Sequence, residues 1–134
     1  MSNFESQYGI TWHNETRRVD ELKPYEKNPR KIGDKEKLDL FESINRMDLA
    51  DVIVIDTDNT IVSGHQRYYI LMSMGRGEDV IDVRVPNRKL TEQEFKEYNI
   101  RANKNTGEDD RNVLKENFEY RDLLEWGYKS EELD

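Results

Sequence analysis

A strand end, a tight turn and a helix start follow one another at residues 61–71, and this stretch constrains the fold more than any other. An apolar pair runs into a turn at Gly64, and a helical pattern begins after it. Such a turn leaves the backbone N–H groups near Gly64 and His65 without intrahelical partners, where the helix dipole adds partial positive charge. Arg67 adds a permanent cation, and His65 adds a titratable donor. The stretch predicts a phosphate site, although a surface helix with a solvated Arg67 would give the same pattern.

The length and composition indicate one cytoplasmic domain with a thin core. The chain has 134 residues, of which 34% are hydrophobic and 37% are charged. No run reaches the roughly 20 apolar residues of a membrane span, and residues 1–10 lack the basic region and apolar block of a secretory signal. The absence of cysteine excludes disulfides, thiolate zinc sites and cysteine nucleophiles, and it agrees with a reducing cytoplasm.

The net charge of −8 opposes strong non-specific binding to nucleic acid, which depends on Lys and Arg side chains. The negative excess is concentrated in residues 107–134, which hold ten acidic and four basic side chains. We expect this acidic, helical segment to cover the sheet or to contact a basic partner.

Hydrophobic periodicity predicts an α+β fold: a small mixed sheet with packed helices, followed by C-terminal helices. Residues 1–16 show no clean periodicity and are expected to form a loose arm. Asp34 is the predicted N-cap of the first helix, and Thr91 and Glu94 are predicted to form a capping box. The expected strands are 18–22, 51–56, 61–62 and 80–85, and the expected helices are 35–47, from Gly64 to near Gly75 or Gly77, 91–102, from Asp109 or Asp110 to 118, and 120–126.

Three short segments resemble the sequence boxes of the ParB N-terminal domain, which folds like sulfiredoxin. The segment from Gly64 to Arg67 is similar to its G-x-x-R box. Asn28-Pro29-Arg30 is similar to the triplet of the first box, and residues 100–104 are similar to the third. The three boxes occur in the family's order. The resemblance covers residues 18–107, and it is closest to the short ParB-like domains of phages and mobile elements.

The resemblance divides the chain into a flexible N-terminal arm at 1–17, a ParB/sulfiredoxin-like domain at 18–107 and an acidic helical extension at 108–134. It implies a domain that binds a nucleoside triphosphate with Mg²⁺ and is linked to DNA transactions, with nucleotide and either DNA or a protein as partners. It also implies that Asn103 helps to hold the metal and the triphosphate. The phosphate-binding residues that we expect from this are Arg30, Ser63, Gly64, His65, Gln66, Arg67, Asn103 and Lys104.

Two departures from the family pattern bear on catalysis. The acid expected just before Asn103 is replaced by Ala102, and metal-assisted hydrolysis needs carboxylates to hold Mg²⁺. Glu94 or Glu97 could substitute for it. Sulfiredoxin chemistry is excluded, because its cysteine is missing.

Two other classes of function stay open beside nucleotide binding. The first is an NTPase, a nuclease or a kinase that uses the same site, for which His65 and Glu97 are the candidate catalytic residues. The second is a non-catalytic acidic interaction protein, an inhibitor or an adaptor, on a degenerate ParB-like fold.

Overall fold

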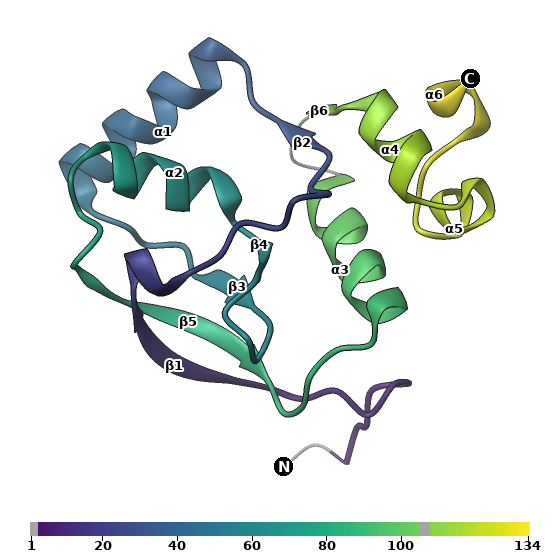
Figure 1. The fold of residues 1–134 in the computed structure, drawn as a ribbon, viewed down its shortest axis with the longest axis horizontal. Coiled ribbons are helices and arrows are strands. Elements are labelled where there is room, and N and C mark those ends of the chain that lie inside the picture. Colours follow the sequence, from purple (N-terminus) through teal and green to yellow (C-terminus); the bar gives the residue numbers. More distant parts are fainter. Residues whose placement is uncertain (1–2, 105–107) are drawn as a thin grey trace.

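A computed structural model describes residues 3–104 and 108–134 and confirms the predicted α+β fold (Figure 1). The main sheet has four strands in the order β1-β5-β3-β4. β5 pairs antiparallel with β1 and parallel with β3, and β3 pairs antiparallel with β4. A small second sheet joins β2 to β6. The strands are β1 (Trp12–Arg18), β2 (Arg30–Lys31), β3 (Ile53–Ile55), β4 (Ile61–Ser63), β5 (Val80–Pro86) and β6 (Glu108–Asp109).

The helices form two groups on either side of α3 (Figure 1). α1 and α2 lie side by side next to the main sheet, and α3 contacts β4. The three short C-terminal helices pack on the other side of α3. The helices are α1 (Asp34–Met47), α2 (His65–Ser73), α3 (Glu92–Lys104), α4 (Arg111–Asn117), α5 (Tyr120–Glu125) and α6 (Ser130–Leu133), together with the 3-10 turn η1 (Val19–Glu21).

Separate apolar cores explain this arrangement. The largest core lies between the main sheet and α1 and α2, and it is built on Ile53, Ile55, Leu71 and Val83, none of which is exposed to solvent. A second core joins Ile100 of α3 to buried side chains of the C-terminal helices. The predicted acidic segment therefore packs against α3 and does not cover the sheet. Burial of this kind contributes about 25 cal/mol for each Å² of apolar surface.

Residues 12–17 correct the expected N-terminal arm, because they belong to β1 and pair with β5 along its length. β1 has a single neighbour in the sheet, so most of its side chains stay exposed and no apolar alternation marks it. The strand expected at 18–22 is also wrong. The chain closes there into η1, where the Glu21 carboxylate accepts a hydrogen bond from the Arg18 N–H at 2.9 Å.

Two of the three predicted helix starts are confirmed. The capping box is confirmed, since Thr91 and Glu94 exchange backbone-to-side-chain hydrogen bonds of 2.8 and 3.2 Å. Asp110 caps α4 as predicted. Asp34 instead lies inside the first turn of α1, after Gly33. Among the described residues, no helix combines the length and apolar character needed to cross a membrane.

Candidate functional site

A cavity of about 260 Å³ lies at the start of α2. Four segments of the chain meet there: β2, α1, the turn from β4 into α2, and the end of α3. Every predicted phosphate-binding residue except Lys104 lines it; the side chain of Lys104 is outside the described part of the structure. The lining residues are Arg30, Ile32, Leu40, Ser63, Gly64, His65, Gln66, Arg67, Ala102 and Asn103.

Gly64 allows the chain to turn sharply from β4 into α2. Its φ of +101° lies in the left-handed region, which residues with a side chain rarely adopt. A Cβ atom at this position would lie 3.2 Å from the side chain of Ile53 and 3.3 Å from its Cα. Both the backbone conformation and the packing against β3 therefore require glycine.

The turn leaves hydrogen-bond donors at the start of α2. The N–H groups of Arg67 and Tyr68 already bond to the Gly64 carbonyl, at 3.1 and 3.3 Å. The N–H groups of His65 and Gln66 come before any intrahelical carbonyl could accept from them. Together with the helix dipole, these donors favour an anion in the cavity.

Two arginines bring positive charge to the same cavity. Burial lowers the pKa of Arg30, the Arg67 cation lowers it further, and the Asp109 carboxylate raises it. Arg67 donates from Nε and from a terminal nitrogen to one oxygen of Asp51, at 3.2 and 2.7 Å. Neither Asp51 nor Asp109 lines the cavity, and the described lining contains no acidic side chain. The lining therefore carries positive charge without acidic residues of its own.

Asn28 fixes the loop that carries Arg30. Its side-chain oxygen accepts from the amides of Asn99 and Asn103, at 3.0 and 3.2 Å. Asn99 is fully buried and also donates to the Val62 carbonyl at 3.0 Å. The sequence reasoning missed Asn99. Its position four residues before Asn103, which places both on one face of α3, was the available signal.

His65 has a different role from the predicted titratable donor. It is buried, and its Nε2 accepts a hydrogen bond from the Tyr25 N–H at 3.0 Å. That bond assigns the remaining proton to Nδ1. Burial lowers the pKa of His65 to about 4, so the ring is neutral at neutral pH. In this structure the ring anchors the loop at Tyr25, and its Nε2 lone pair is already engaged.

This buried ring predicts a pH-dependent stability. An unfolded histidine has a pKa of about 6.5, so below that pH the unfolded chain binds a proton that the folded chain does not. Stability should be complete above about pH 6.5 and fall as the pH drops, by about 2 kcal/mol down to pH 5. Urea unfolding of the wild type and of His65→Gln at about pH 6.5 and at about pH 5 measures this loss of stability. In His65→Gln, the free energy of unfolding should lose this part of its dependence on pH. His13→Gln, which changes a half-exposed ring, should keep it. The same dependence on pH in all three proteins would contradict the assignment.

The other residues considered for catalysis or metal binding contribute less. Glu97 accepts hydrogen bonds of 2.8 Å from the Tyr8 hydroxyl and from Arg101, and it does not line the cavity. Glu94 is held by Arg88, which lowers its pKa to about 2. Ala102 lines the cavity at the position where the family pattern has an acid. In the described part of the chain, no three His, Asp or Glu side chains gather as a metal site. Asn103 lines the cavity and offers an amide oxygen, which suits Mg²⁺ that also binds ligand phosphates.

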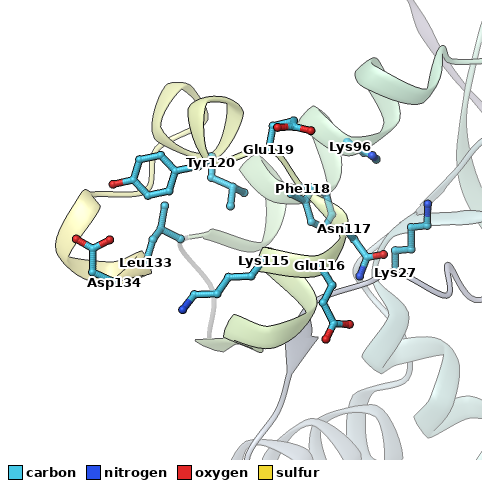
Figure 2. Close-up of a pocket in the computed structure, with 11 residues that line it drawn as sticks. Lys27, Lys96, Lys115, Glu116, Asn117, Phe118, Glu119, Tyr120, Leu133 and Asp134 are labelled. Atoms are coloured by element: carbon cyan, nitrogen blue, oxygen red, sulfur yellow. The ribbon is translucent and has the colours of Figure 1, made fainter.

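A larger cavity of about 640 Å³ lies beside the C-terminal helices (Figure 2). Three lysines from three segments line it: Lys27, Lys96 and Lys115. Three acidic side chains, those of Glu116, Glu119 and Asp134, line it as well. Because the two signs balance, this cavity does not favour an anion as the cavity at α2 does.

Comparisons with protein-family models and with curated proteins give no match for this chain. Solved structures match it in fold. One structure of a pNOB8-like ParB N-domain gives a TM-score of 0.56 at 13% identity, over 86% of this chain and 43% of that one. Another gives 0.53 at 13% identity, over 94% and 42%. The C-terminally truncated chromosome-partitioning protein ParB from Caulobacter crescentus, complexed with CTP-γ-S, gives 0.57 at 21% identity, over 90% and 68%.

This chain spans less than half of the two pNOB8-like structures and 68% of the Caulobacter structure. Identities of 13–21% show a shared fold and leave the activity open.

Proposed function

The chain has the fold of a ParB N-terminal domain, and we propose that its cavity at the start of α2 binds the phosphates of a nucleoside triphosphate. One observation carries the proposal: Arg30 and Arg67, from distant parts of the sequence, meet at a helix N-terminus in a cavity whose described lining holds no acid. Guanidinium groups, and backbone N–H groups without an intrahelical partner, are complementary to phosphate at a helix N-terminus. The Caulobacter protein was crystallised with CTP-γ-S, which makes CTP the first ligand to test.

Each lining residue has a role in this proposal. Arg67 and Arg30 pair with phosphate oxygens, and the N–H groups of His65 and Gln66 donate to them. The hydroxyl of Ser63 adds a further donor at the same end of the helix. Asn103, with Lys104 beyond it, closes the far side. Mg²⁺ would enter with the triphosphate and be held by Asn103 and by the ligand's own oxygens, where it neutralises phosphate charge.

We propose binding without hydrolysis. General base catalysis needs a group within hydrogen-bond reach of the attacking water or hydroxyl. Nε2 of His65 is occupied by the Tyr25 N–H, and Glu97 lies outside the lining. An NTPase, a nuclease or a kinase at this cavity therefore has no described carboxylate or available imidazole nitrogen to act as its base.

The wider context is also a proposal. We infer a role in DNA transactions in the cytoplasm, in the manner of the ParB-like domains of phages and mobile elements. With a net charge of −8, contact with DNA would be made through a partner protein more readily than by this chain itself.

Thermal unfolding with ATP, CTP, GTP and UTP, each with and without Mg²⁺, tests the proposal. A ligand that binds only the folded state adds about 2.7 kcal/mol at 100 times its dissociation constant, which is an easily measured shift. We expect at least one triphosphate to raise the melting temperature, and we expect its nucleoside, which lacks phosphates, not to do so. Equal melting temperatures with every nucleotide would contradict the proposal.

A second candidate function is a non-catalytic interaction protein that binds through its C-terminal helices. Tyr120 and Leu124 lie one helical turn apart on α5, and both side chains are exposed. The surrounding segment is strongly acidic, which suits a basic partner. If no nucleotide stabilises the protein, this surface becomes the preferred assignment.

A further inference from the structure

We infer that Asp51 is a resident competitor for Arg67, which a ligand phosphate must displace before it can bind. This inference rests on the proposed function, because it concerns the same cavity. It adds a residue outside the lining that sets how strongly charged a ligand has to be. Asp51 thus acts on ligand affinity through Arg67.

The geometry places Asp51 where a phosphate oxygen would pair with Arg67. A single Asp51 oxygen accepts from two nitrogens of the guanidinium, at 2.7 and 3.2 Å. A phosphate oxygen that pairs with the fork of an arginine makes the same kind of contact. The two interactions use the same donors, so ligand binding at Arg67 exchanges one ion pair for another.

Asp51 is also easy to displace. Its side chain is 69% exposed, whereas that of Arg67 is 32% exposed. Ion pairs in contact with water are weak, and the freed carboxylate can be solvated at once.

Asp109, the acid beside Arg30, is held more firmly than Asp51. Asp109 lies in β6, directly opposite Arg30 of β2, and the Tyr128 hydroxyl donates to its carboxylate. Strand pairing and the hydrogen bond from Tyr128 fix Asp109 in the fold. Of the two cavity arginines, Arg67 is therefore the one whose partner is free to change when a ligand arrives.

The exchange has a consequence for ligand choice. A ligand with several phosphate charges gains more from Arg67 and Arg30 together than it loses by displacing one exposed carboxylate. A ligand with a single weakly charged group has fewer other contacts to offset the same cost. Asp51 thus lowers the affinity of triphosphates and monophosphates by the same factor, and only a ligand with further contacts still binds well.

Asp51→Asn tests the inference, because it removes the charge and keeps the size of the side chain. We expect the variant to bind the triphosphate that stabilises the wild type about two- to fivefold more tightly in a calorimetric titration, the range that an exposed ion pair supplies. A gain of similar size is expected for the matching monophosphate, because both ligands displace the same carboxylate. Asp39→Asn is the matched control: Asp39 is an exposed acid of α1 paired with Lys35, so this variant changes the net charge equally but leaves Arg67 untouched.

Ionic strength gives a second measurement. In the wild type, salt weakens both the Asp51 pair and the ligand contact, whereas in Asp51→Asn it weakens only the ligand contact. The advantage of the variant should therefore shrink as salt rises and vanish near about 1 M, where the Debye length is about 3 Å.

The outcomes separate the two ideas. If the wild type binds a triphosphate and Asp51→Asn binds it no more tightly, or Asp39→Asn gains as much, the inference is overturned and the proposed function stands. If neither the wild type nor Asp51→Asn binds any triphosphate, both are overturned.

Discussion

Replacing Arg67 with alanine is expected to weaken triphosphate binding by about a hundredfold. The substitution removes one of the two arginines that line the cavity. Charge-assisted hydrogen bonds contribute about 1.5–3 kcal/mol, and about 1.4 kcal/mol corresponds to a factor of ten in affinity. The backbone N–H groups at the start of α2 and Arg30 would remain, so residual binding is expected at high ligand concentration. Calorimetric titration of the variant against the wild type measures the loss.

The variant should remain folded, which makes the binding result interpretable. The pair between Arg67 and Asp51 is in contact with solvent, so its removal should lower the free energy of unfolding by less than about 1 kcal/mol. Arg46→Ala is the matched control, because Arg46 is also a helical arginine paired with an acid, Glu42, but lies on α1 outside the cavity lining. If Arg67→Ala keeps the wild-type affinity, Arg67 is not the phosphate ligand.

The cavity could be predicted from the sequence because its main parts are local. The turn at Gly64, the helix after it and the cation one turn later are encoded within a few residues. Arg30 and Asn103 were added by resemblance to ordered sequence boxes, and the structure places both in the same lining as Arg67. Each of these parts is encoded by residues that are neighbours in the sequence, so each can be predicted locally. The tertiary structure has only to bring the parts together.

Other features could not be predicted because they depend on contacts between distant residues. β1 is held by backbone pairing with β5, which leaves no apolar pattern in its own sequence. The role of His65 follows from the Tyr25 N–H, and Tyr25 lies on a separate loop. Asp51, in the loop before β3, meets Arg67 of α2. In each case the partner determines the role, and the sequence alone does not identify the partner.

The predicted boundary at residues 107 and 108 separates segments that the structure joins. The N–H of Asp110 donates to the Pro29 carbonyl at 2.6 Å, and β6 pairs with the strand that carries Arg30. Ile100 of α3 lies in one core with the C-terminal helices. The acidic helices are thus attached directly to the loop and to the helix that hold one side of the cavity.

Gly64→Ala should be among the most damaging single substitutions in the chain, with an expected loss of about 3 kcal/mol of stability. Two costs add up at this position. A residue with a side chain in the left-handed region costs about 1–2 kcal/mol, and forcing an extra methyl group into packed structure costs about 1–3 kcal/mol. Part of the clash is with the Cα of Ile53, which a change of rotamer cannot relieve. Urea unfolding at neutral pH measures the sum.

Gly75→Ala separates the two costs. Gly75 has a φ of +77°, but a Cβ atom there would meet nothing within 4 Å, so this variant should lose only about 1–2 kcal/mol. The difference between the two variants is then the cost of packing against Ile53. Gly64→Ala should also weaken triphosphate binding beyond its effect on stability, because relief of the clash moves the first N–H groups of α2 away from the cavity. Gly75→Ala lies at the other end of that helix and should bind normally. Equal losses of stability in the two variants would show that the close approach to Ile53 does not constrain the turn.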